Sequence, residues 1–223
     1  MPRIHFHQQL DALKEKLLGM AALAQLAVQT AVEAYLRRDA ALCQYVRDNE
    51  QAINRAHREV DEMAYELLAK EQPMAVDLRF ILSVIKINSD LERIGDQSAG
   101  IAKRTLALLE VDNAELPADI LGMGEVVSRM IRTAIQSLVD ADALVADSVL
   151  RMDDEIDRMN RVARTGLIGV IQRTPDVTTQ ALNGILISRS LERIGDHAAN
   201  IATDVIFWVR GADVRHQLSL AVD

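Results

Sequence analysis

The sequence predicts an all-α protein built from two tandem, antiparallel three-helix bundles. Its four prolines, Pro2, Pro73, Pro117 and Pro175, all lie between long segments that have the apolar spacing of helices. Proline inside a helix removes a hydrogen bond and clashes with the preceding turn, so these positions mark helix boundaries. No stretch of useful length alternates in the manner of a strand. In addition, one six-residue string occurs twice in the chain.

The spacing predicts six long helices. They are expected at residues 4–37, 40–70, 75–109, 118–147, 149–173 and 177–210. In the second of them, apolar residues recur every seven positions, at Val46, Ile53, Val60 and Leu67. Such a seam is typical of a helix that packs against neighbouring helices.

The duplicated string is Leu-Glu-Arg-Ile-Gly-Asp, at 91–96 and again at 191–196. Each copy follows a proline-marked turn and a further amphipathic helix, so the repeat divides the chain into two helical units. The joints between helices are short, which predicts antiparallel neighbours. The predicted units and their linker are residues 1–110, 118–212 and 111–117.

Composition and charge narrow the class of protein. Hydrophobic residues make up 49% of the 223 residues, which is enough for a core without disulfides or a structural metal. The one cysteine, Cys43, is interpreted as a small buried side chain rather than a nucleophile. The net charge of −8 disfavours nucleic acid and anionic membrane surfaces as direct partners.

The N-terminal residues lack the apolar region of a signal peptide. The longest uncharged run, 17–32, contains two glutamines and is too short to span a membrane. We therefore expect a cytoplasmic protein.

Carboxylates dominate the duplicated string. Glu92 and Asp96 stand four residues apart, and Glu192 and Asp196 repeat them. Residues at this spacing are neighbours on a helix surface, and the helical angle places both pairs away from the apolar seam. Two neighbouring carboxylates repel unless a cation or a basic group lies between them. The duplicated acids are therefore expected to face outward.

The preceding helix of each unit carries further oxygen donors at the same spacing. They are Asp153 and Asp157 in the second unit, and Glu50 and Asn54 in the first. Two adjacent helices of this kind can offer several ligands to a cation. Oxygen donors suit Mg²⁺, Mn²⁺, Ca²⁺ or iron better than zinc. The alternative is a solvated acidic face, paired with residues such as Arg93 and Arg193.

Motifs for catalysis are missing from the sequence. There is no phosphate-binding glycine loop, no His-Glu-x-x-His and no Glu-x-x-His of di-iron bundles. His57 is interpreted as a surface histidine, and His197 could at most flank a site. We expect neither an enzyme nor a bound organic cofactor. Gly95 and Gly195, next to seam residues, predict close helix approach.

The duplicated string, each copy followed by Ile-Ala, resembles the signature repeat of the PhoU family. The run Gln-Pro-Met-Ala-Val-Asp-Leu-Arg at 72–79 and the closing run Asp-Val-Ile-Phe-Trp-Val-Arg-Gly at 204–211 are also similar to that family. With the first helix included, the similarity spans nearly the whole chain.

The resemblance implies a regulator of phosphate uptake, formed by two three-helix bundles and expected as a homodimer. Its expected partners are the ATPase subunit of the phosphate-specific ABC transporter and a sensor histidine kinase, so that it meets the membrane only through the transporter. It would repress the starvation response when phosphate is plentiful. Some family members hold metal clusters on acidic motifs, which implies Fe, Mn, Mg or Zn on these residues: Glu92, Asp96, Glu192, Asp196, Asp153, Asp157, Glu50 and Asn54.

Asn54 departs from the family pattern, which has aspartate at this position. Its amide oxygen can coordinate a cation but adds no charge, so the first site is expected to bind more weakly than the second. Gln97, where the second unit has His197, is a further difference. Two alternatives stay open: a relative that regulates a different transporter, and a helical-bundle enzyme that uses carboxylate-bound metal.

Overall fold

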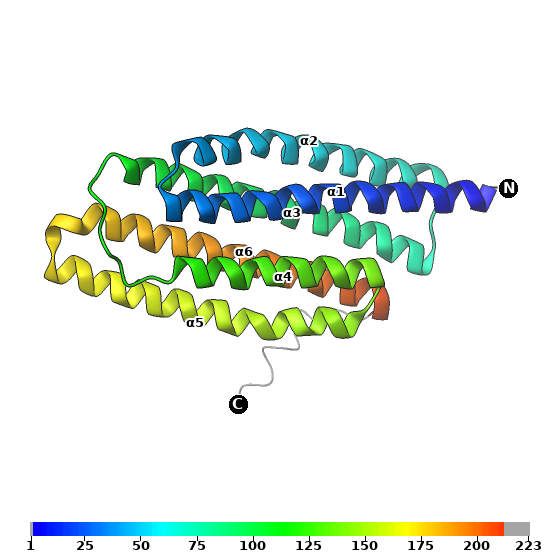
Figure 1. The fold of residues 1–223 in the computed structure, drawn as a ribbon. Coiled ribbons are helices and arrows are strands. Elements are labelled where there is room, and N and C mark those ends of the chain that lie inside the picture. Colours follow the sequence, from blue (N-terminus) through cyan, green and yellow to red (C-terminus); the bar gives the residue numbers. More distant parts are fainter. Residues whose placement is uncertain (1, 212–223) are drawn as a thin grey trace, which may run out of the picture.

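The computed structural model describes residues 2–211, and side chains from residue 4 onward. Residues 1 and 212, the outer ends of the two predicted units, lie outside this range. The described chain forms six long α-helices, which confirms the predicted all-α class (Figure 1). Their bounds are α1 Pro2–Arg37, α2 Ala40–Glu71, α3 Ala75–Leu109, α4 Ile120–Asp140, α5 Ala143–Arg173 and α6 Thr178–Arg210, with a 3₁₀ turn at Pro175–Val177.

Consecutive helices run antiparallel, as the short joints predict (Figure 1). Helices α1 to α3 form one three-helix bundle, and α4 to α6 form the other. The bundles meet along α3 and α6, with a second contact between α1 and α4. Helices α2 and α5 lie on the outer sides (Figure 1).

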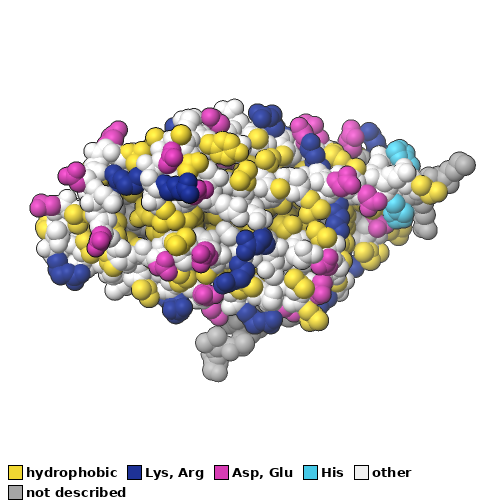
Figure 2. All heavy atoms as spheres, viewed as in Figure 1, with side chains coloured by type: hydrophobic (Ala, Val, Ile, Leu, Met, Phe, Trp, Pro, Cys, Tyr) yellow, Lys and Arg dark blue, Asp and Glu magenta, His cyan; other side chains and the backbone are white. Residues whose placement is uncertain are grey.

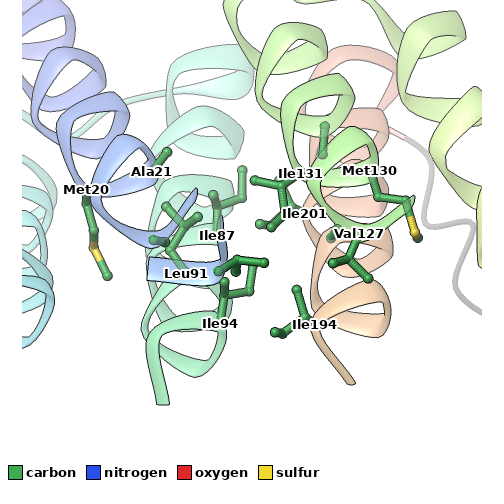
Figure 3. Close-up of a cluster of buried hydrophobic side chains, with 14 of the residues drawn as sticks. Met20, Ala21, Ile87, Leu91, Ile94, Val127, Met130, Ile131, Ile194 and Ile201 are labelled. Carbon is green, nitrogen blue, oxygen red and sulfur yellow. The ribbon is translucent and has the colours of Figure 1, made fainter. Parts of the chain in front are cut away.

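One hydrophobic core runs through both bundles. Figure 3 shows its centre, where Ile87, Leu91 and Ile94 of α3 lie near Ile194 and Ile201 of α6. All five side chains are fully buried. Burying a side chain of this size contributes about 1.5–3 kcal/mol, so the contact between the repeats is a large part of what stabilises the fold.

The joint between α4 and α5 lies earlier than predicted. The sequence interpretation ran the fourth helix to residue 147, whereas α4 ends at Asp140. Ala141 adopts a left-handed conformation, and the Asp142 side chain accepts hydrogen bonds from the backbone N–H groups of Leu144 and Val145. This N-cap satisfies the first free donors of α5 and starts a new helix there. Asp39 caps α2 in the same way.

The segment between the two bundles is tied down by Arg38. Its guanidinium donates to the carbonyl oxygens of Leu108, at 2.6 Å, and Val111, at 2.8 Å. It also donates to Asn113 Oδ1 at 3.4 Å. One cation therefore satisfies the C-terminal end of α3 and the start of the connection to α4. The boundaries of the two predicted units, at residues 110 and 118, stay a prediction.

Helix α1 is apolar and long. By length and composition alone, Ile4–Arg37 could cross a membrane, but 56% of its most apolar window is buried inside the fold. Leu13, Leu17 and Ala24 of this helix are fully buried against other helices. The apolar composition of α1 is therefore that of a helix buried in a protein core.

The two repeated glycines lie where helices approach closely, as predicted. A Cβ atom on Gly195 would lie 2.9 Å from Ile156 Cγ2 on α5, and one on Gly95 would lie 2.9 Å from Ile53 Cδ1 on α2. Both distances are too short for a methyl group unless the isoleucine moves. Only glycine lets α3 and α6 lie this close to their partners.

Gly195→Ala should lower the free energy of unfolding by about 1 kcal/mol, because overpacking outweighs the gain of about 1 kcal/mol in helix propensity. Chemical denaturation of the purified variant measures this change. Gly19→Ala is the control, since no atom lies within 4 Å of its added Cβ, and it should stabilise α1. Equal stabilisation by both changes would contradict the close-approach interpretation.

Candidate metal centre

The motif residues of the first repeat meet between α2 and α3. Asn88 of α3 sets the register of the two helices, since its Nδ2 donates to the His57 carbonyl oxygen and to Asp61 Oδ1, both at 2.9 Å. In this register Glu50 on α2 experiences the negative charges of Asp96 and Glu92 on α3. We call Glu50, Asn54, Glu92 and Asp96 the first oxygen cluster.

The second repeat places its residues in the same way between α5 and α6. Ser188 of α6 donates to Asn160 Oδ1 of α5 at 3.1 Å, and Gly195 packs on Ile156. Asp153 on α5 lies within electrostatic reach of Asp196 and Glu192 on α6. We call Asp153, Asp157, Glu192 and Asp196 the second oxygen cluster.

Most of these acids are partly buried, whereas the sequence predicted that they face outward. The side chain of Glu92 is 25% exposed and that of Asp96 is 35% exposed. The helical-wheel estimate placed them opposite the core because it considered one apolar seam. Helix α3 packs against α1, α2 and α6 at once, so its buried arc is wide and the acids lie at the edge of the contact with α2.

Burial and mutual repulsion raise the pKa values of several carboxyls. Burial is the main cause for Glu50, followed by the charge of Asp96. Burial, then Asp196 and Asp157, raise the pKa of Asp153 from 3.8 to about 6. The pKa values of Glu192 and Asp196 are raised for the same two reasons. Each cluster therefore holds negative charge at a cost, which a cation would relieve.

Arginine compensates part of the charge of both clusters. Arg93 lies 3.6 Å from both Glu92 and Asp96, which is the ion pairing considered as an alternative to metal binding. In the second cluster, Arg161 lies 3.9 Å from Asp157. Asp153 Oδ1, however, is buried and has no hydrogen-bond partner. The charge of Asp153, on which four other acids act, is thus poorly compensated.

The chemistry of the donors fits a hard cation, since each cluster offers only carboxylate and amide oxygens. The unpartnered oxygen of Asp153, and the raised pKa values of Asp153 and Glu192, also favour a bound cation. In the described part of the chain, however, no three Asp, Glu, His or Cys side chains converge closely enough to enclose a metal ion as they stand. Side-chain rotation would be needed for three of them to reach one ion.

His197 flanks the second oxygen cluster, since its charge acts on Asp196. Its Nδ1 lies 2.8 Å from Oδ1 of Asp90, which is on α3 in the other repeat. Sequence reasoning overlooked Asp90, because this contact depends on how the two bundles pack. His57 is half-buried, with Nε2 3.8 Å from Asp61 Oδ2. Cys43 is fully buried, as predicted, and burial raises the pKa of its thiol.

A separate groove of about 610 Å³ lies between α1 and α4. Val32, Leu36 and Leu121 contribute apolar surface to it, and apolar side chains gather between these helices in Figure 2. None of the eight predicted cluster residues lines this groove. The acids and the groove therefore occupy different surfaces.

The fold and these clusters define a class: a duplicated helical protein that displays one acidic cluster on each repeat. The family model described as PhoU domain matches this chain twice, at residues 17–105 and 120–205. Each match contains one copy of the duplicated string.

Curated relatives match over nearly the full chain. A phosphate-specific transport system accessory protein PhoU homolog of Pseudomonas aeruginosa is 39% identical over 214 residues, which cover 95% of this chain and 88% of the relative. PhoU homolog 1 of Thermotoga maritima is 31% identical over 216 residues, covering 96% and 93% of the two chains.

Solved structures agree with the fold. The crystal structure of PhoU from Pseudomonas aeruginosa superposes with a TM-score of 0.89 at 38% identity, covering 93% of this chain and 100% of the other. A phosphate transport system regulatory protein PhoU from Streptococcus pneumoniae gives a TM-score of 0.87 at 28% identity, with 94% and 99% coverage. The chain belongs to the PhoU family.

Proposed function

We propose that this chain is a cytoplasmic regulator of phosphate uptake. It acts as an adaptor between the ATPase subunit of the phosphate-specific ABC transporter and a sensor histidine kinase, and it represses the starvation response when phosphate is plentiful. The observation that carries the proposal is the match of both repeats, over nearly the whole chain, to proteins named as phosphate transport accessory proteins.

The position of the acids favours an adaptor over an enzyme. Catalysis generally requires a concave site that restricts water around the reacting groups. Here the oxygen clusters lie along the edges of helix contacts, and the apolar groove between α1 and α4 contains none of them. Carboxylates arranged in this way suit cation binding on a surface that meets other proteins.

The two oxygen clusters would hold a divalent cation or an iron cluster. The second cluster would bind the cation more tightly than the first. Such a cation would neutralise repelling carboxylates and link α5 to α6, or α2 to α3. The buried, unpartnered oxygen of Asp153 favours the second cluster, and Arg93 and Asn54 weaken the first. A homodimer completes the proposed assembly.

The regulatory proposal is tested in a deletion strain of the source organism that carries a phosphatase reporter and grows in excess phosphate. We expect high reporter activity without the gene and low activity after the wild-type gene is restored. Glu192→Ala combined with Asp196→Ala tests whether the second cluster takes part, and this variant should leave the reporter partly active.

A reporter that stays low in the deletion strain would contradict the proposal. It would favour the second candidate, a regulator of a different transporter, for which the neighbouring genes would encode that transporter. Circular dichroism of the double variant should show unchanged helicity, because these side chains lie at the edges of the helix contacts rather than in the core.

A further inference from the structure

A set of polar contacts joins the two repeats at one end of the α3–α6 interface. Lys86 Nζ lies 3.2 Å from Asp204 Oδ1, and Asp90 Oδ1 lies 2.8 Å from His197 Nδ1. Asn200 Nδ2 also donates to Asp90 Oδ1, at 3.3 Å. We call these five residues the clasp. The Asp204 side chain is only 8% exposed and the Lys86 side chain is 39% exposed, so the clasp extends from the packed interface to its edge.

The clasp lies away from the connection between the repeats. Helices α3 and α6 run antiparallel, so the early part of α3 meets the late part of α6, whereas residues 110–119 join the bundles at the other end (Figure 1). The backbone link and the clasp thus hold the two repeats at opposite ends of the same interface.

The internal repeat predicts an equivalent set of contacts at the linker end, because each position in the first repeat has a counterpart one hundred residues later. The counterparts of the five clasp residues are Leu186, Ser190, Gln97, Gly100 and Arg104. Across the described helices, no side-chain hydrogen bond or ion pair joins residues 97–109 to residues 178–190. The Nε atom of Arg104 is buried there without a partner. Among the described residues, opposite charges therefore meet at one end of the interface and not at the other.

This asymmetry matters because the two repeats are similar enough to pair with copies of themselves. If two first repeats from different chains met in the observed geometry, Lys86 of each would face Arg104 of the other. If two second repeats met, Asp204 of each would face Leu186, so the ion pair with Lys86 would not form. The first arrangement opposes like charges and the second gives up an ion pair, so pairing within the chain is favoured over both.

We propose that the clasp selects pairing between the first and second repeats of one chain over pairing between like repeats of two chains. The centre of the core contributes little to this choice, since Ile94 and Ile194 are the same residue in both repeats, whereas the contact of Phe80 with Trp208 favours the same pairing as the charges. The charges discriminate, as polar residues do when they set register in helical interfaces. A homodimer of this protein must then use a surface other than the α3–α6 interface.

The test compares charge variants of the full chain by thermal unfolding and by light scattering after size exclusion. Lys86→Glu faces Asp204 within the chain, but it would attract Arg104 in a pair of first repeats. We therefore expect a melting temperature lower by roughly 5–10 °C and a mass above that of the wild type, increasing with concentration. Asp204→Lys also opposes like charges within the chain, but it gains no attraction to Leu186 in a pair of second repeats, so it should lower the melting temperature without raising the mass.

Lys86→Glu combined with Asp204→Lys restores opposite charges within the chain, and it should recover most of the lost melting temperature and the wild-type mass. Lys103→Glu, the same change at an exposed lysine of α3, is the control and should alter neither quantity. The proposal fails if Lys86→Glu and Asp204→Lys have the same mass, because the clasp would then stabilise the interface without selecting the partner.

Discussion

Asp153→Asn should raise the melting temperature of the metal-free protein at pH 7 and remove most of the stabilisation that Mn²⁺ gives to the wild type. Asp153 is half-buried among Asp157, Glu192 and Asp196, and burial followed by these charges raises its pKa to about 6. Its ionised form is therefore disfavoured in the folded protein. An amide of the same shape carries no charge and avoids this cost.

The sign of the pH dependence follows from the same shift. The unfolded chain releases the Asp153 proton near pH 3.8, whereas the folded protein keeps it until about pH 6. The folded state thus binds more protons between these values, and this group makes the protein less stable as the pH rises through that window. After allowance for solvent screening, the contribution at pH 7 is about 1 kcal/mol, or roughly 2–4 °C in melting temperature.

A cation reverses the advantage of the variant. A ligand present at one hundred times its Kd stabilises a protein by about 2.7 kcal/mol, and wild type should gain this amount when Mn²⁺ binds the second oxygen cluster. Asp153→Asn removes one negative ligand and most of the gain. Thermal scans at pH 4.5 and pH 7, with and without Mn²⁺, measure both effects.

Asp154→Asn is the matched control, since it removes the adjacent carboxylate, which is exposed. It should change the metal-free melting temperature little and keep the Mn²⁺ response. If both variants lost the response equally, Mn²⁺ would be binding through general negative charge rather than at the second oxygen cluster.

Asn54→Asp should strengthen cation binding at the first oxygen cluster by about tenfold, which corresponds to 1.4 kcal/mol. The substitution adds a charged oxygen donor beside Glu50, Glu92 and Asp96, where the wild type has a neutral amide. The added charge also increases repulsion without metal, so the metal-free variant should unfold at a lower temperature than the wild type. Calorimetric titration with Mn²⁺ measures the affinity of the two clusters.

Gln51→Asp is the control for this change, because it adds the same charge to an exposed position of α2. An increase in affinity as large as that of Asn54→Asp would show that net charge, rather than the added ligand, controls binding. A variant whose first cluster stays unoccupied at high Mn²⁺ would show that Arg93, which pairs with Glu92 and Asp96, excludes the cation.

The repeated string and the prolines were enough to predict the fold, and the string supplied the acids that α3 and α6 contribute to each cluster. Glycine and carboxylates at fixed positions on one helix determine which face packs and which face carries charge, and these relations are local. The α4–α5 joint was misplaced because the apolar spacing of a helix continues on both sides of Asp140, Ala141 and Asp142, which are not buried. Recognising Asp142 as an N-cap, by analogy with Asp39, would have located it.

Contacts between the repeats were beyond the reach of the sequence. Asp90 and His197 are 107 positions apart, and their contact depends on the rotation of one bundle against the other. The large pKa shift of Asp153 depends instead on packing within the second repeat, where α5 and α6 bring four carboxylates together. A helical wheel describes one helix and therefore misjudged how far Glu92 is buried.

The continuous core around Ile94 and Ile194 limits how the chain can be divided (Figure 3). Either half, expressed alone, would present a wide apolar face to water and would need a second molecule to cover it. Joining both halves in one polypeptide replaces a bimolecular association with an intramolecular one, at an effective concentration of order millimolar. Correct assembly then no longer depends on how many copies of the protein the cell contains.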